Sequence, residues 1–182
     1  MSNFVFIERN IDVRPILNQV LANPQDWRAV SQYENVGGLK NPPGFLPLIM
    51  AIAEDPYKAM DSEQLVRTPM FDKYDEVLQF IFNKGITKLS RAAFFKLAVG
   101  CGVPWHIDEG TYYKHKDRYH LSLQGRYRYK VDDEEHIIEP GTFFWFDNKK
   151  YHEAENISPD TDRITFVFDS PHSPTNPHHL VK

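Results

Sequence analysis

A succession of short strand-like runs in the second half of the chain constrains the fold most. Turn-forming residues separate the runs, which are rich in aromatic and aliphatic side chains. The runs read RAAFFKLAV, RYHLSL, RYRYKV, EHII, TFFWF and RITFVF. In RYRYKV, Tyr127, Tyr129 and Val131 alternate with charged residues, as expected of a strand with one buried face. Many short strands with regular turns indicate a β-sandwich or a β-barrel.

The first half of the chain has a different pattern, which we interpret as helical and irregular. Apolar residues at helical spacing predict helices over residues 11–21 and 72–84. Asp12 and Asp72 are the expected caps of these helices. Between them, the apolar run NPPGFLPLIMAIAEDP fits either a buried helix or a covering loop. Helices that precede the strands are expected to buttress one sheet.

The length of 182 residues fits a single domain. We expect residues 1–90 to pack as a helical or irregular part on a β core formed by residues 91–170. Residues 171–182 are expected to form a C-terminal tail.

Charge and cysteine content restrict the partners and the compartment. The formal net charge of -4 argues against non-specific binding to nucleic acid or to an anionic membrane. Cys101 is the only cysteine, and MSNFVFIERN has no signal-peptide pattern. No apolar run approaches the roughly 20 residues that span a bilayer. We therefore expect a cytoplasmic protein with no membrane partner, and the sequence predicts no particular oligomeric state.

Three residues form a candidate metal site. His106 and Asp108 lie two positions apart, and in an extended segment such side chains point the same way. His152 is the best candidate for a third ligand. Two histidines and one carboxylate on one face of an octahedron leave three positions free, which suits a non-haem Fe(II) oxygenase. Each residue alone has an ordinary alternative, because a solvated or hydrogen-bonded histidine is more common than a metal ligand.

Cationic residues strengthen this interpretation. Arg163 begins a strand-like run, and a buried arginine facing the metal would be costly without an anionic partner. A dicarboxylate cosubstrate would supply that partner through two parallel hydrogen bonds, and Thr165 on the same strand face would add a hydroxyl. Arg118 and His120 share one strand face and are candidates for holding the other end of the cosubstrate.

The strand region resembles the aspartyl/asparaginyl β-hydroxylase-like branch of the 2-oxoglutarate- and Fe(II)-dependent oxygenases. The resemblance runs from about residue 91 to residue 172 and rests on PWHID, RYHLSL, EPGTFFWFDNKKYHEAEN and DRITFVFDSPH. It implies a mainly β fold, a double-stranded β-helix of the jelly-roll or cupin-like type, buttressed by N-terminal helices.

The same resemblance implies a reaction and a set of residue roles. His106 and His152 would bind Fe(II), and 2-oxoglutarate would contact Arg163, Arg118 and His120. With O2 as the oxidant, the implied reaction hydroxylates a small amino acid or a peptidyl residue and decarboxylates 2-oxoglutarate to succinate.

Asp108 distinguishes the chain from the peptidyl aspartyl hydroxylases of this family. Those enzymes have glycine at this position and bind iron without a carboxylate. The chain looks more like the free-proline hydroxylases of the same branch, which keep two histidines and one carboxylate. A small-molecule substrate and a peptide substrate both stay open.

Two other functions are consistent with these residues. A cupin-like module binds a metal or a small molecule without oxygenase turnover, although such a module has no need of Arg163. An oxygenase acting on a nucleic-acid base is motivated by a local basic cluster. The cluster comprises Lys114, Lys116, Arg118, Arg126, Arg128 and Lys130. A solvated strand face is the simpler interpretation of this cluster in a chain of negative net charge.

Overall fold

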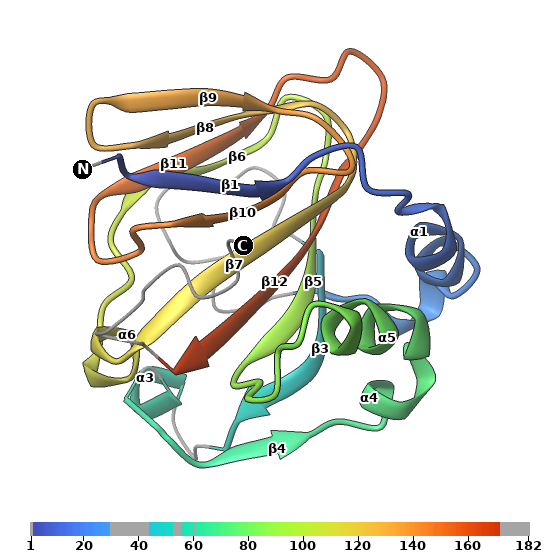
Figure 1. Ribbon diagram of the computed structural model, residues 1–182, viewed down its shortest axis with the longest axis vertical. Coiled ribbons are helices and arrows are strands. Elements are labelled where there is room, and N and C mark those ends of the chain that lie inside the picture. The colour runs from blue at the N-terminus through green and yellow to red at the C-terminus, as the bar shows by residue number, and fades with distance from the viewer. Residues whose placement is uncertain (1, 30–43, 53–55, 60, 172–182) are drawn as a thin grey trace.

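The computed structural model describes residues 2–29, 44–52, 56–59 and 61–171. Two antiparallel sheets face each other and form a double-stranded β-helix (Figure 1). The larger sheet has the order β1 (Phe4–Glu8), β10 (Phe143–Phe146), β7 (Lys116–Gln124), β12 (Arg163–Pro171), β5 (Ala92–Leu97), β3 (Gly44–Ala51) and β2 (Arg28–Ala29), and β4 (Leu65–Arg67) also pairs with β3. The smaller sheet has the order β6 (Gly102–His106), β11 (His152–Asn156), β8 (Tyr127–Val131) and β9 (Glu134–Ile138). The expected mainly β fold is confirmed.

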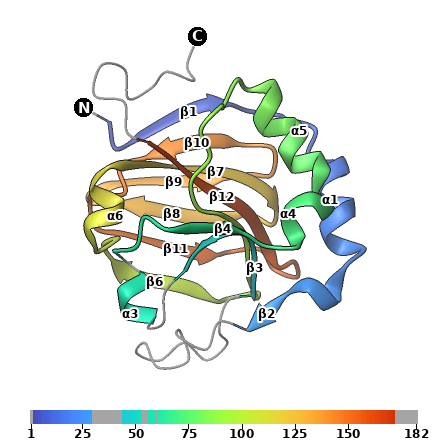
Figure 2. The ribbon, with the colours of Figure 1, turned by 90° about the horizontal axis from the view of Figure 1, so that it is seen from below.

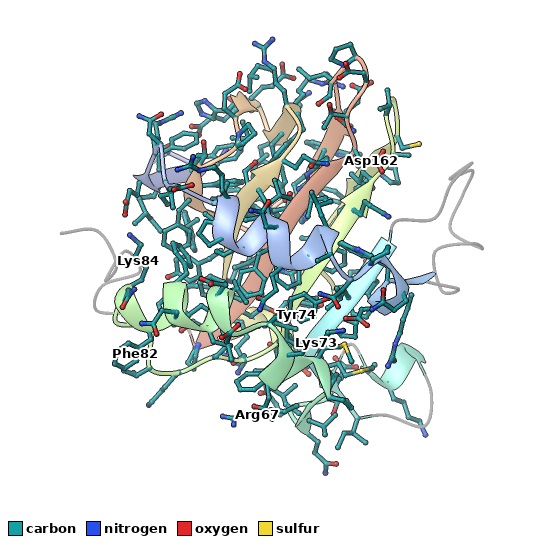
Figure 3. The ribbon with its side chains drawn as sticks, turned by 90° about the vertical axis from the view of Figure 1, so that its right-hand side faces the viewer. Arg67, Lys73, Tyr74, Phe82, Lys84 and Asp162 are labelled. Atoms are coloured by element: carbon teal, nitrogen blue, oxygen red, sulfur yellow. The ribbon has the colours of Figure 1, made fainter. Side chains whose placement is uncertain are left out.

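The helices lie outside the two sheets. They are α1 (Arg14–Leu21), η1 (Pro24–Asp26), α3 (Pro56–Ala59), α4 (Met70–Lys73), α5 (Asp75–Asn83) and α6 (Thr111–Lys114). Figure 2 shows α1, α4 and α5 grouped at one side of the molecule, with α3 and α6 at the opposite side. Figure 3 shows α1 and α5 lying across the larger sheet. No helix within the described ranges is long and apolar enough to cross a membrane.

Strand β10 shows how the sheets build two cores. All four of its residues are buried, because alternate side chains enter different cores. Phe144 and Phe146 pack between the two sheets against residues of β8. Phe143 and Trp145 pack on the helix-covered face, where Phe80 of α5 meets Phe143 edge-on with ring centroids 5.3 Å apart. The helices therefore cover the outer face of the larger sheet and leave its inner face to the space between the sheets.

A glycine turn joins β7 to β8 and fixes the start of β12. Gly125 has a φ of +78°, and a Cβ at this position would lie 2.9 Å from both the Asp162 carbonyl oxygen and the Arg163 Cα. Glycine alone accommodates the positive φ together with this close approach. Gln124 Nε2 also donates a hydrogen bond of 3.0 Å to the Asp162 carbonyl oxygen. The turn thus positions the backbone from which Arg163 enters the space between the sheets.

The first half of the chain contains more strand than its sequence predicts. Both β1 and β3 belong to the larger sheet, which corrects the description of residues 1–90 as only helical and irregular. Most of the described part of NPPGFLPLIMAIAEDP forms β3, and is neither a helix nor a covering loop. Pro47 falls where the pairing of β3 with β5 is shifted by a bulge, and a strand tolerates proline at such a point. Beyond Pro171, the last residue of β12, the expected tail lies outside the described residues.

The two predicted helices are present, but their caps differ from the prediction. Helix α1 begins at Arg14, and Asp12 accepts a hydrogen bond of 3.1 Å from the Arg14 backbone N–H without occupying the cap position. The second predicted helix is divided at Tyr74 into α4 and α5, so Asp72 lies inside α4. Tyr74 leaves helical geometry, and its ring is fully buried in the core between the helices and the larger sheet (Figure 3).

Candidate metal centre

The strand register brings the three predicted ligands to one point. His106 ends β6, His152 begins β11, and the two residues are partners in the ladder between these strands. Their ring centroids lie 4.2 Å apart. Asp108 follows β6 by two residues, and the ligand atoms of all three residues lie within 4.8 Å of one another. This spacing fits a single metal ion held by two imidazoles and one carboxylate.

Backbone hydrogen bonds fix both imidazoles. His106 Nδ1 lies 2.8 Å from the Pro104 carbonyl oxygen, and His152 Nδ1 lies 2.9 Å from the Lys150 carbonyl oxygen. Because a carbonyl oxygen only accepts, each Nδ1 carries a proton and donates it. Burial lowers the pKa of His152 to about 4, so this ring is neutral at physiological pH. Each Nε2 is left to bind a metal, which is the arrangement typical of metal-ligating histidines.

Arg118 contacts the carboxylate of Asp108 from one side. Its Nη1 donates a hydrogen bond of 2.8 Å to Asp108 Oδ2, while Asp108 Oδ1 lies 3.9 Å from His106 Nε2. Its Nε and Nη2 donate to the two oxygens of Asp169 at 2.9 and 3.1 Å. Although burial opposes it, the two carboxylates raise the pKa of Arg118 well above its usual value. The sequence predicts Arg118 as a cosubstrate contact, whereas the structure places three of its nitrogens on carboxylates of the chain itself.

A cavity of about 250 Å³ opens between the two sheets beside these residues. Apolar residues of both sheets, among them Phe95, Val103 and Val167, form part of its lining. The polar lining consists of the three candidate ligands together with Tyr113, Arg118, His120, Tyr129 and Arg163. A cavity of this size and mixed lining suits a small ligand.

Arg163 is a buried cation that has no anionic partner among the described residues. It is 4% exposed, and no carboxylate within the described ranges forms an ion pair with it. Its Nε donates a hydrogen bond of 2.9 Å to Thr165 Oγ1, and its Cζ lies 4.0 Å from the centre of the Tyr127 ring. An uncompensated buried guanidinium is costly, and an anionic ligand in the cavity would remove that cost. Thr165, predicted as a direct contact of the cosubstrate, here orients the guanidinium.

Several buried polar atoms near Arg163 also lack partners. His120 Nδ1, Ser122 Oγ and the Tyr127 hydroxyl have no hydrogen-bond partner in the part of the chain that the structure describes. Burial, reinforced by the positive charges of Arg163 and Arg118, lowers the pKa of His120 well below its usual value. Unpartnered buried polar atoms are rare in folded proteins, so each of these atoms needs an explanation such as a bound ion or a functional role. Arg163 and His120, which line the cavity, therefore fit an anionic ligand there.

Tyr129 is a cavity residue that the sequence does not predict for the site. Its ring lies nearly parallel to that of His152 at 6.2 Å and edge-on to that of His120 at 5.4 Å. Burial raises the pKa of its hydroxyl, so the group stays protonated and can donate a hydrogen bond. Its place in the alternating run of β8 predicts a buried ring, but only the pairing of β8 with β11 brings that ring to the metal site.

The local basic cluster is largely neutralised by carboxylates. Lys116 lies 3.0 Å from Glu63, and Arg126 lies 2.8 Å from Glu139. Arg128 pairs with Glu135 and Glu155, and Arg118 with the two aspartates described above. These ion pairs offset the charge of four of the six residues of the cluster.

Two facing antiparallel sheets, beside which two histidines and a carboxylate converge, define a double-stranded β-helix protein with a trio of residues that could hold one metal ion. Within that class, the model of the aspartyl/asparaginyl beta-hydroxylase family matches residues 22–173. The chain belongs to this family. Membership supports an oxygenase of the hydroxylase type, which agrees with the resemblance seen in the sequence. No curated protein matches the chain.

A solved structure with a TM-score above 0.5 shares the fold, and two others are less similar. An oxidoreductase of the 2OG-Fe(II) oxygenase family from Burkholderia pseudomallei has a TM-score of 0.59 and 12% identity, over 92% of this chain and 85% of that one. A predicted oxalate decarboxylase from Thermotoga maritima has a TM-score of 0.47 and 16% identity, over 80% of this chain and 91% of that one. The cupin domain of Cnp3 from Schizosaccharomyces pombe has a TM-score of 0.44 and 13% identity, over 85% of this chain and 83% of that one.

Proposed function

We propose that this protein is an Fe(II)- and 2-oxoglutarate-dependent dioxygenase. In the proposed reaction a small amino acid or a peptidyl residue is hydroxylated, and 2-oxoglutarate is decarboxylated to succinate. The observation that carries the proposal is the presence, around one cavity, of a metal-ligating trio and a buried arginine with no anionic partner in the described chain. Membership of the hydroxylase family supports the same reaction.

The candidate ligands would hold the iron through Nε2 of His106, Nε2 of His152 and Oδ1 of Asp108. When bound, Fe(II), 2-oxoglutarate and O2 supply the oxidation of a C–H bond, a chemistry that belongs to the cofactor and cosubstrates. A trio of this kind would leave coordination positions of the metal open for a chelating cosubstrate.

The chain itself binds and orients the cosubstrate. Arg163 would pair with the distal carboxylate through two parallel hydrogen bonds, with its Nε already fixed by Thr165. The neutral His120 ring and the Tyr129 hydroxyl offer further polar contacts in the same cavity. Phe95, Val103 and Val167 exclude water from the space between these groups, which strengthens each electrostatic contact.

The size of the cavity restricts the substrate. About 250 Å³ must hold the metal, the cosubstrate and the reacting end of the substrate, so that end must be small. A free amino acid or the side chain of a peptidyl residue meets this requirement. The carboxylate of Asp108, which peptidyl aspartyl hydroxylases lack, favours testing free amino acids first.

Succinate release tests the proposal. The protein is incubated with Fe(II), 2-oxoglutarate and O2, together with a library of free amino acids and short peptides. We expect one class of compound to stimulate succinate release and to gain one oxygen atom, as measured by mass spectrometry. His106→Ala should abolish both signals, whereas His115→Ala, at an exposed position, should keep them. Metal binding without succinate formation under any condition would contradict the proposal and favour a cupin-like binding module.

A further inference from the structure

We propose that Asp169 is a positioning residue of the metal site. It holds the Arg118 guanidinium against Asp108, so that one carboxylate oxygen of Asp108 is occupied and the other faces the two histidines. The inference rests on the proposed function, because it concerns the carboxylate that would bind the iron. Asp169 was not among the site residues predicted from the sequence.

The Arg118 guanidinium donates hydrogen bonds to two carboxylates, those of Asp169 and Asp108. One edge of its guanidinium, Nε and Nη2, donates to Asp169 Oδ1 and Oδ2 at 2.9 and 3.1 Å. The remaining nitrogen, Nη1, donates to Asp108 Oδ2 at 2.8 Å. The Tyr113 ring lies 4.7 Å from the Arg118 Cζ and covers one face of the group. The two-bond contact with Asp169 fixes the plane of the guanidinium, and this plane sets the direction of Nη1.

Asp169 is itself held from several sides. It is 1% exposed, and β12 places it directly opposite Arg118 in the ladder with β7. Tyr112 donates a hydrogen bond of 3.2 Å from its hydroxyl to Asp169 Oδ2 and accepts one of 3.0 Å from the Arg91 backbone N–H. Backbone hydrogen bonds with Ser90 and Arg91 fix the main chain of Asp169. Strand β12 therefore holds Asp169 in place, and Asp169 in turn holds Arg118 against Asp108, the proposed metal ligand.

The contact between Arg118 and Asp108 has a consequence for metal binding. A carboxylate with both oxygens free can bind a metal through either or both of them, and binding through both would occupy a position needed by the cosubstrate. The hydrogen bond from Nη1 occupies Oδ2 and leaves Oδ1 as the atom nearest His106 Nε2, at 3.9 Å. Outer groups that orient a metal ligand are typically worth about 10–100-fold in metal affinity or activity.

Co(II) in place of Fe(II) provides the test, because its visible absorption reports the coordination of the metal. We expect Asp169→Asn in the 182-residue chain to weaken Co(II) binding by about 10–100-fold and to change this absorption. The matched control is Asp117→Asn, an equally buried carboxylate on β7 that contacts Lys149 and Trp145 and does not belong to the described lining of the cavity. This control should bind Co(II) like the wild type.

A double-mutant cycle separates a positioning role from a general effect on folding. If Asp169 acts through Arg118 on Asp108, Asp169→Asn should have little further effect on Co(II) binding in an Asp108→Asn background. If circular dichroism shows that Asp169→Asn does not fold, Tyr112→Phe replaces it, since that change keeps the ring and removes the hydroxyl that donates to Asp169 and accepts from the Arg91 backbone N–H. Tyr112→Phe should then weaken Co(II) binding by a few-fold with the fold intact.

The possible results of these experiments distinguish a failure of the role of Asp169 from a failure of the proposed function. Wild-type affinity and absorption in folded Asp169→Asn would overturn the inference while leaving the proposed function standing. Unchanged Co(II) binding in Tyr112→Phe would overturn it if the asparagine variant is unfolded. Equal losses with and without Asp108 would also overturn it, because the effect would not pass through that ligand. Failure of the wild-type protein to bind Co(II) at all would overturn the proposed function, and this inference with it.

Discussion

His106 and His152 face each other across the ladder between β6 and β11, with ring centroids 4.2 Å apart. Each ring donates its Nδ1 proton to the backbone carbonyl two residues earlier, at Pro104 and Lys150. The backbone of the smaller sheet therefore fixes both the position and the tautomer of the two rings. A metal binding between them would find both Nε2 atoms already oriented, so little reorganisation would oppose its binding.

Replacing Arg163 should separate cosubstrate binding from metal binding. Truncating one partner of a buried charge pair costs about 2–5 kcal/mol, so Arg163→Gln should weaken 2-oxoglutarate binding by about 30-fold or more. Calorimetric titration of 2-oxoglutarate into the Mn(II)-loaded protein measures this loss. Arg126→Gln, which removes an exposed ion pair with Glu139, is the matched control.

The same variant carries a second expectation. Because Arg163 is buried without a carboxylate partner in the described chain, Arg163→Gln should not lower the Tm of the ligand-free protein. A marked loss of Tm, combined with unchanged 2-oxoglutarate affinity, would show that the guanidinium serves the fold and not the cosubstrate.

The Tyr129 hydroxyl should contribute to cosubstrate binding. Hydrogen bonds to charged groups contribute about 1.5–3 kcal/mol, so Tyr129→Phe should weaken 2-oxoglutarate binding by about tenfold or more. The KM for 2-oxoglutarate, measured by succinate formation, would report the change. Tyr151→Phe, at a half-exposed ring outside the cavity lining, should leave it unchanged. Equal KM values for Tyr129→Phe and the wild type would exclude this hydroxyl from the cosubstrate site.

Acid should destabilise the metal-free protein. Burial lowers the pKa of His120 below its ordinary value of 6.5, so the unfolded chain takes up a proton that the folded chain refuses. The free energy of unfolding should therefore fall as the pH drops below about 6.5, and urea unfolding at several pH values measures this. His120→Gln should reduce the slope, whereas His115→Gln, at an exposed position, should not. A slope unaffected by His120→Gln would contradict this origin.

Substitution of Gly125 should affect both the stability of the protein and the position of Arg163. Gly125→Ala combines an unfavourable positive φ with a Cβ only 2.9 Å from the Arg163 Cα. Gly100→Ala is the matched control, because its φ of +69° imposes similar strain while no atom lies within 4 Å of the added Cβ. The control should lose about 1 kcal/mol of stability. Gly125→Ala should lose more and should also weaken 2-oxoglutarate binding. Equal stabilities of the two variants would show that the close approach has no energetic effect.

The sequence predicts the local parts of the site better than its long-range contacts. The two-residue spacing of His106 and Asp108 is a property of one extended segment, so it is visible without a fold. Asp169 and Tyr112 could not be assigned in the same way. Their roles depend on the pairing of β12 with β7 and on the place of α6 beside them, and neither follows from local periodicity.

The same difference between local patterns and long-range pairing explains which strands the sequence predicts. Strands with one polar face, such as β8, are recognisable because their side chains alternate. Strand β3 is buried over its central residues and contains Pro47, so neither alternation nor strand propensity identifies it. Its strand conformation comes from pairing with β5 on one side and β4 on the other.

Anaerobic titration with Fe(II) and 2-oxoglutarate tests the central claim most directly. A metal-to-ligand charge-transfer band arises only when 2-oxoglutarate chelates an iron held by the protein. We predict this band in the wild type and in His115→Ala, and its loss in His106→Ala and His152→Ala. An identical spectrum in the wild type and His106→Ala would contradict the assignment of the metal centre.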